Sequence, residues 1–154
     1  MDTTVEYLSP EKHKDLEAEL NNLKTVERKK IAEHLDYAKS LGDLSENAEY
    51  SEARDKQAEI EDRISQIETI LKNAVIIKKR SHSIVEIGST VIIKKDGGAE
   101  TVYIIVGSEE ADMTTGKISH QSPIGNALLG HKKDDSVLIQ TPRGEVTYKI
   151  IEVK

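Results

Sequence analysis

The sequence predicts an α+β protein, in which a long antiparallel α-helical coiled coil precedes a small β-rich domain. Apolar residues recur in steps of four and three through two charged segments that flank Gly42, as in paired amphipathic helices. From residue 84 onward the apolar residues gather in short runs separated by turn signals, as in β-strands. We therefore expect a hairpin over residues 1–77 with its turn at 42–46, a linker at 78–83 and a globular domain over 84–154.

The first helix is predicted to begin at Ser9-Pro10-Glu11. Ser9 can cap the helix, Pro10 suits the first helical position, and the carboxylate of Glu11 favours the positive end of the helix dipole. An apolar stripe follows and is interrupted by a less regular stretch around Val26. The members of this stripe are Leu16, Leu20, Leu23, Ile31, Leu35 and Ala38.

The second helix is predicted to start near Asn47 and to stop at Asn73, because asparagine tolerates the left-handed conformation of a helix end. Its stripe consists of Ile60, Ile64, Ile67, Leu71 and Ala74. Each stripe is too narrow to stabilise a lone helix, so we expect the two helices to pack against each other and, with a short connection, to run antiparallel. At the helical rise per residue, such a hairpin is about 40 Å long.

The C-terminal part is predicted to form a small sheet with one short helix. The turn signals are Asp96-Gly97-Gly98 and Pro142-Arg143-Gly144. The helix lies over Ser122–Gly130, with Ser122 as its cap and Gly130 ending it. The predicted strands are Ile84–Ile87, Thr90–Lys94, Thr101–Val106, Ser136–Gln140 and Val146–Val153.

Composition excludes several classes of function. The chain has no cysteine, so it has neither disulfides nor thiolate zinc sites, and its five histidines show no metal-ligand spacing. The net charge of −6 argues against binding nucleic acid by general phosphate neutralisation. No signal peptide and no apolar run of membrane-spanning length is evident, so we expect a cytoplasmic protein without membrane contact.

Two carboxylates, Asp43 and Glu46, lie in the predicted turn at the end of the hairpin. Asp-Leu-Ser-Glu has the form of a capping box, in which Asp43 accepts from the backbone N–H of Glu46. The alternative is a half-site for Mg²⁺, which prefers oxygen ligands and would need further ligands from elsewhere. A helix cap does not require a long arm, whereas a donated half-site does. On the residues alone both interpretations stay open.

The turn segment resembles the coiled-coil tip of the bacterial Gre transcript-cleavage factors, and the chain is similar to this family over nearly its whole length, closest to the A type. The resemblance implies an FKBP-like C-terminal domain. The tip motif is Gly42-Asp43-Leu44-Ser45-Glu46-Asn47-Ala48-Glu49-Tyr50, followed by Ala53-Arg54. Further matches are Asn73-Ala74, Ile105-Val106-Gly107, Glu110-Ala111-Asp112, Ser122-Pro123-Ile124, Leu128-Leu129-Gly130 and Thr141-Pro142-Arg143-Gly144-Glu145-Val146.

The resemblance also implies a function. In the family, the coiled coil passes down the secondary channel of RNA polymerase, and the tip helps to hold a second Mg²⁺ that the polymerase shares. The factor is then no enzyme itself but stimulates the polymerase to cleave the 3′ end of backtracked nascent RNA. Asp43 and Glu46 match the tip carboxylates, Lys39 and Arg54 match a basic patch for the extruded RNA, and Asn47 and Tyr50 support the tip. The protein is expected to be monomeric and to bind Mg²⁺ weakly, if at all, without polymerase.

Three other functions remain open at this stage. One is an inhibitory homologue that occupies the channel without promoting cleavage, and the presence of Asp43 and Glu46 counts against it. A prolyl isomerase or chaperone is a second, although the only aromatic residues of the second domain are Tyr103 and Tyr148. The third is a coiled-coil adaptor without chemistry.

Overall fold

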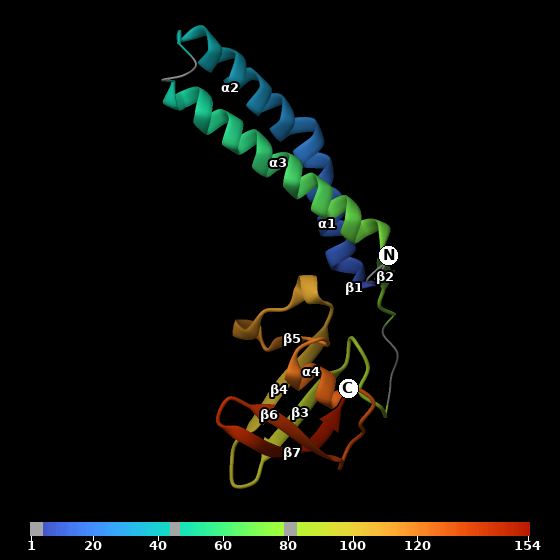
Figure 1. The fold of residues 1–154 in the computed structure, drawn as a ribbon. Coiled ribbons are helices and arrows are strands. Elements are labelled where there is room, and N and C mark those ends of the chain that lie inside the picture. Colours follow the sequence, from blue (N-terminus) through green and yellow to red (C-terminus); the bar gives the residue numbers. More distant parts are fainter. Residues whose placement is uncertain (1–4, 44–46, 79–82) are drawn as a thin grey trace. The chain divides into compact units, whose positions relative to one another are not determined.

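The computed structural model describes residues 5–43, 47–78 and 83–154. Its chain divides into two compact units, which Figure 1 shows as a helical hairpin and a β-rich part. The hairpin unit spans His13–Asn73, and the other unit combines the residues up to Lys12 with Ala74–Lys154. The predicted α+β class with an N-terminal helical hairpin is confirmed. Of the predicted linker 78–83, residues 79–82 lie outside the described residues.

The first arm of the hairpin is helical throughout, but it changes helix type in the middle. It consists of α1 (Pro10–Asn22), a π-helical segment η1 (Leu23–Glu27) and α2 (Arg28–Ser40). The backbone N–H of Arg28 donates to the carbonyl of Leu23, the five-residue spacing of a π-helix. The π-helical segment therefore coincides with the stretch around Val26 where the apolar stripe is irregular.

The second arm is the single helix α3 (Ala48–Lys72). Its apolar face packs against that of the first arm in a cluster formed by Ile31, Leu35, Ala53, Ile60 and Ile64, with Leu20, Leu23 and Tyr50 at its margin. Asn73 ends the helix as predicted, but with φ −100° and ψ 6° it does not adopt the left-handed conformation. Its N–H instead donates to carbonyls of the preceding turn, at Thr69 and Ile70, which closes the helix without a positive φ.

Where the chain enters and leaves the helices, two short strands pair in parallel. They are β1 (Glu6–Leu8) and β2 (Ala74–Ile76), with Tyr7 opposite Val75. Ser9 caps α1 as predicted, because its Oγ accepts from the N–H of Lys12 at 3.1 Å. The carboxylate of Glu110 in turn accepts from the N–H and the hydroxyl of Ser9 at 2.6 and 3.0 Å. These contacts join the first strand to the β-rich unit.

The β-rich unit contains a five-stranded sheet in the order β5-β4-β3-β7-β6. All neighbours are antiparallel except β4 and β5. The core of the unit is an aliphatic cluster that includes Val91, Ile105, Leu128 and Ile150. The strands are β3 (Thr90–Lys95), β4 (Glu100–Val106), β5 (Lys117–Ser119), β6 (Ser136–Thr141) and β7 (Gly144–Val153).

Short helical elements complete this unit. They are the 3₁₀ turns η2 (Ser108–Glu110) and η3 (Met113–Thr115) and the helix α4 (Pro123–Leu128). Ser122 caps α4 as predicted, since its Oγ accepts from the N–H of Gly125 at 3.0 Å. Gly130 follows the helix with φ +79°. The FKBP-like classification of this unit stays a prediction.

One predicted strand is wrong. Residues Ile84–Ile87 form no strand, and only Ile84 makes an isolated bridge, to Lys132. The carbonyl and N–H of Val85 instead bond to Gly130 and His131, beyond α4. This segment therefore runs beside the end of the short helix rather than within the sheet.

Candidate functional site

The described part of the hairpin ends in an abrupt turn after α2. The N–H of Leu41 donates to the carbonyl of Ala38 at 3.2 Å. Gly42 follows with φ +117°, a backbone conformation that residues other than glycine rarely adopt. The chain thus leaves the helix at once, and Asp43 comes next with its side chain exposed.

Only part of the predicted carboxylate pair can be placed. Asp43 lies at the exposed end of the first arm, whereas Glu46 lies outside the described residues. Within residues 5–43, 47–78 and 83–154, no group of three or more His, Asp or Glu side chains forms a metal-binding arrangement. Carboxylate oxygens are the ligands that Mg²⁺ prefers, so the chemistry of the two residues fits that ion, and as two ligands they make only part of a site.

Asn47 caps the second helix, and the predicted capping bond of Asp43 involves Glu46, which lies outside the described residues. The Oδ1 atom of Asn47 accepts from the N–H of Tyr50 at 3.1 Å. Its Nδ2 donates to the carbonyl of Ala38 at 2.6 Å, across to the end of the first arm. An asparagine directly before the first helical residue is itself a preferred cap, a signal that the capping-box interpretation passed over.

Tyr50 is half-buried and packs against the apolar cluster of the hairpin. Near it, Ala38 and Ala53 are both fully buried. Such small side chains let two helices approach closely. The end of the hairpin near the turn is therefore closely packed, and Tyr50 lies at the margin of its apolar cluster.

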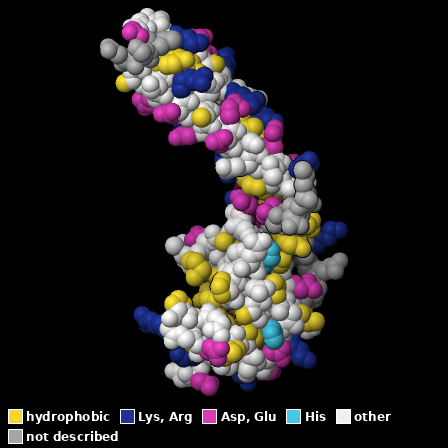
Figure 2. All heavy atoms as spheres, in the orientation of Figure 1, with side chains coloured by type: hydrophobic (Ala, Val, Ile, Leu, Met, Phe, Trp, Pro, Cys, Tyr) yellow, Lys and Arg dark blue, Asp and Glu magenta, His cyan; other side chains and the backbone are white. Residues whose placement is uncertain are grey.

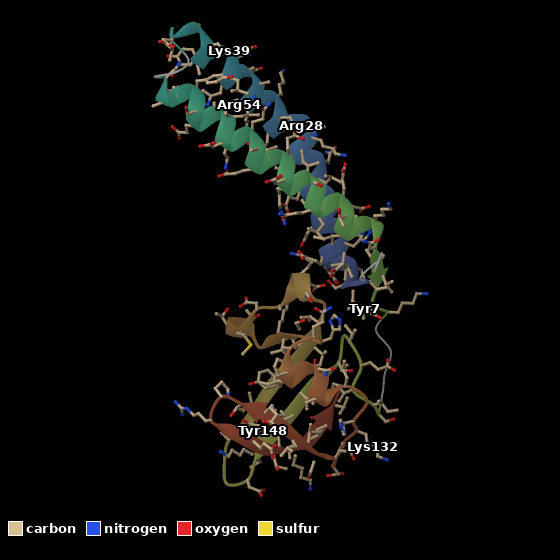
Figure 3. The ribbon with its side chains drawn as sticks, in the orientation of Figure 1. Tyr7, Arg28, Lys39, Arg54, Lys132 and Tyr148 are labelled. Carbon is tan, nitrogen blue, oxygen red and sulfur yellow. The ribbon has the colours of Figure 1, made fainter. Side chains whose placement is uncertain are left out.

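Lys39 and Arg54 lie on one side of the hairpin. Arg28 and Glu61 define this side, because they pair across the two arms. Lys39 follows Arg28 by about three helical turns, and Arg54 precedes Glu61 by about two, so each lies on the same face as its reference residue. Both are exposed and lie in the half of the hairpin nearer the turn (Figure 3).

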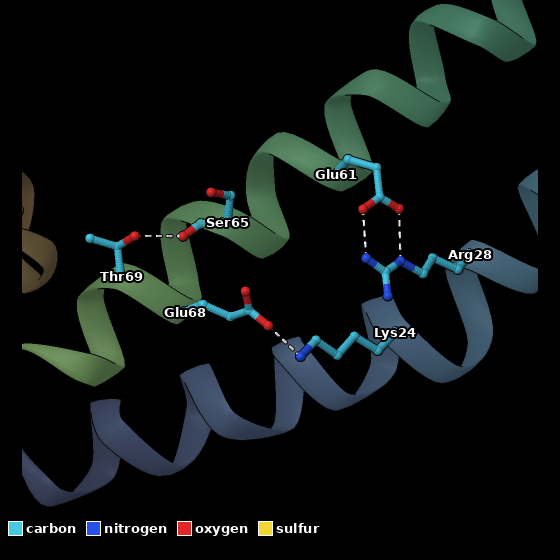
Figure 4. A network of polar contacts seen from close by, with 6 residues as sticks. All are labelled: Lys24, Arg28, Glu61, Ser65, Glu68 and Thr69. Carbon is cyan, nitrogen blue, oxygen red and sulfur yellow. Dashed lines mark hydrogen bonds and ion pairs between the residues drawn. The ribbon is translucent and has the colours of Figure 1, made fainter.

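Farther from the turn, the cations of this side are paired with carboxylates. The guanidinium of Arg28 donates to both oxygens of Glu61, at 2.7 and 2.6 Å, and Lys24 pairs with Glu68 (Figure 4). The hydrogen bond to Glu61 raises the pKa of Arg28, and the same bond lowers the pKa of Glu61. Both charges therefore persist over the neutral pH range.

Lys39 and Arg54 differ from these cations, because neither forms an ion pair within the described part of the chain. Figure 2 shows acidic and basic side chains interspersed over the face of the hairpin that is in view. Two unpaired cations near the turn are thus a small feature on a mixed surface. They can contact one or two phosphates but not a long stretch of nucleic acid.

Two family models together match almost the whole chain. One, described as the N-terminal part of a transcription elongation factor, matches residues 6–76, and the other, described as the C-terminal part of GreA/GreB, matches residues 80–154. The chain belongs to the GreA/GreB family of transcription elongation factors.

The relatives place it with the A type of this family. It is 46% identical over 151 residues to the transcription elongation factor GreA of Halalkalibacterium halodurans, covering 96% of both chains. It is 47% identical over 150 residues to GreA of Bacillus cereus, covering 96% of this chain and 95% of the relative. Among solved structures, GreA factor homolog 1 of Thermus thermophilus is 27% identical, with 97% and 99% of the two chains covered and a TM-score of 0.45.

No helix in the described ranges is both long enough and apolar enough to cross a membrane.

Proposed function

We propose that this elongation factor inserts its helical hairpin into the secondary channel of RNA polymerase and stimulates cleavage of backtracked nascent RNA. The observation that carries the proposal is the position of Asp43, exposed directly after the turn that ends the first arm. Family membership supports it, because the tip motif that contains Asp43 and Glu46 is intact in this sequence.

Asp43 and Glu46 would hold a second Mg²⁺ together with carboxylates of the polymerase. Bound there, Mg²⁺ lowers the pKa of a water molecule and so supplies the nucleophile for phosphodiester hydrolysis. The role of this chain is to bring two carboxylates to the active centre of its partner. On this proposal the factor is not an enzyme, since the polymerase contributes the first metal ion and the catalytic aspartates.

Lys39 and Arg54 would contact the 3′ segment of RNA that backtracking extrudes. Both cations lack a carboxylate partner among the described residues, so their charge is available to a phosphate. With only two such cations and a net charge of −6, this contact orients the RNA locally and adds little affinity. We further propose that the factor acts as a monomer in the bacterial cytoplasm, where polymerase and nascent RNA are found.

An inhibitory homologue that fills the same channel without promoting cleavage is the second candidate. The test is cleavage of RNA in backtracked polymerase complexes with Asp43→Asn, Glu46→Gln and the double variant. Each single variant should bind polymerase like the unaltered protein. Each should also lose stimulated cleavage by about 100-fold, because a metal-holding group contributes several kcal/mol to the transition state.

Asp62→Asn is the matched control, because Asp62 is an exposed acidic residue in the middle of α3. It should cleave normally. A double variant that still cleaves at the normal rate would show that the tip carboxylates have been assigned wrongly. A protein that binds polymerase and slows elongation without cleavage would instead be the inhibitory homologue.

A further inference from the structure

Four cations follow one another along the side of the hairpin that carries Lys39 and Arg54. On the first arm, Arg28 and Lys24 lie about 16 and 22 Å from Lys39, at the helical rise per residue. On the second arm, Arg54 lies about 10 Å nearer the turn than Glu61, the partner of Arg28. It therefore falls within the row that the other cations form, as Figure 3 shows.

The cations of this row differ in the carboxylates beside them. Arg28 donates to both oxygens of Glu61, and Lys24 pairs with Glu68 (Figure 4). Each of these pairs has no net charge, because both of its members are ionised at neutral pH. The two cations nearer the turn have no such partner in the part of the chain that the structure describes.

Both pairs lie at the surface of the hairpin. The side chains of Arg28 and Glu61 are 43% and 46% exposed, and those of Lys24 and Glu68 are 38% and 50% exposed. Water and salt screen ion pairs in such positions, so the pairs contribute little to folding. Removing one carboxylate therefore leaves an exposed cation on a hairpin that still forms.

We propose that Glu61 and Glu68 are specificity-determining residues, which confine the contact with extruded RNA to the part of the hairpin near the turn. This inference rests on the proposed function, in which the RNA leaves the active centre alongside the hairpin. A phosphate beside Lys39 or Arg54 releases counterions and so binds. A phosphate farther from the turn meets a neutral pair, in which repulsion by the carboxylate offsets attraction by the cation.

The test compares Glu61→Gln, Glu68→Gln and the double variant with the unaltered protein on two kinds of backtracked complex. In one, the extruded 3′ segment is a dinucleotide, which is too short to reach Arg28. In the other, the segment is longer than the row of cations. On the long segment, the factor concentration that gives half-maximal cleavage should fall about fivefold for the double variant, the equivalent of two exposed ion pairs. Each single variant should show a smaller decrease.

The dependence on salt gives a readout that a change of stability alone would not alter. Each phosphate contact on a single strand contributes about 0.7 to the slope of log affinity against log salt concentration. On the long segment, the slope for the double variant should therefore be steeper by about 1.4 than that for the unaltered protein. On the dinucleotide, cleavage and its salt dependence should stay unchanged, which also shows that the variants are folded.

Glu52→Gln is the matched control, because Glu52 is an exposed carboxylate of the same helix with no ion pair among the described residues. It should behave like the unaltered protein on both complexes. Adding Arg28→Gln to Glu61→Gln should abolish the gain of the latter, since the released cation is then absent.

Two results overturn the inference while the proposed function stands. One is an unchanged half-maximal concentration of the double variant on the long segment. The other is an equal gain on both complexes, because the released cations would then contact polymerase rather than RNA. If the unaltered protein stimulates no cleavage on either complex, the proposed function is overturned, and the inference with it.

Discussion

Gly107 lies between strand β4 and the turn η2, where the backbone of β1 passes directly beside it. A Cβ atom built on Gly107 would lie 1.7 Å from the carbonyl oxygen of Tyr7. The φ angle of Gly107 is −66°, which any residue adopts, so the close approach alone requires glycine here. This contact sets how near the first strand comes to the rest of its unit.

Gly107→Ala should therefore destabilise the β-rich unit. The added methyl group must displace backbone rather than a flexible side chain, which typically costs about 1–3 kcal/mol. Differential scanning calorimetry should show a lower midpoint for the transition of this unit. Gly98→Ala is the control, because its nearest neighbours lie at 3.4 Å, an ordinary contact, and its midpoint should stay close to that of the unaltered protein.

The helix caps show what single residues reveal before the structure is known. Ser9 and Ser122 each precede a proline and then a helix, and both predictions are confirmed. For the second helix, the sequence predicts a start near Asn47 but not the bonds of the Asn47 side chain. The bond from its Nδ2 to the carbonyl of Ala38 could not be predicted, because that carbonyl lies on the other helix.

Among elements, the π-helical segment Leu23–Glu27 explains the interrupted apolar stripe. Before it, Leu16, Leu20 and Leu23 advance in steps of four and three. Continuing these steps would reach residues 27, 30, 34 and 37, but the buried residues are Ile31, Leu35 and Ala38. The stripe after the segment is thus displaced by one residue. A π-helical turn takes up one extra residue, so the same side of the arm faces α3 on both sides of it.

Deleting Val26 should therefore convert the first arm into one continuous α-helix with an unbroken stripe. Val26 is 39% exposed, so little packing is lost. Circular dichroism should show unchanged helix content and a thermal midpoint equal to or above that of the unaltered protein.

Deleting Ala32 provides the contrast, because this exposed residue lies within regular helix. Its loss rotates one part of the stripe by about 100° relative to the other, since each residue advances a helix by that angle. The midpoint should fall clearly. Equal destabilisation by the two deletions would show that the π-helical segment does not correct the stripe.

The elements that the sequence did not reveal are short and depend on distant partners. β1 and β2 have three residues each and pair with one another, although the whole hairpin separates them in the chain. β5 also has three residues and joins the sheet only through β4. In contrast, Ile84–Ile87 has the composition of a strand without a neighbouring strand to pair with. The long helices needed no such partner to be predicted, because their periodicity extends over many turns.

For the whole molecule, the proposed sharing of a metal site with polymerase predicts weak Mg²⁺ binding in isolation. Two carboxylates are too few ligands, because Mg²⁺ requires near-octahedral oxygen coordination. Isothermal titration calorimetry of the purified protein should give no stoichiometric binding at micromolar Mg²⁺, and the same should hold for Asp43→Asn. Tight binding of one ion per chain would contradict a site that polymerase has to complete.

The parallel pairing of β1 with β2 makes the hairpin an insertion within a discontinuous unit. Residues up to Lys12 and from Ala74 onward belong to that unit, and His13–Asn73 is the inserted module. Ser9 alone separates β1 from α1, and Asn73 alone separates α3 from β2, so each of the paired strands leads directly into one arm. The sheet therefore fixes only the two attachment points. The length and surface of the inserted module can therefore differ between members of the family while the host unit stays the same. With the attachment points unchanged, the hairpin of one member can replace that of another.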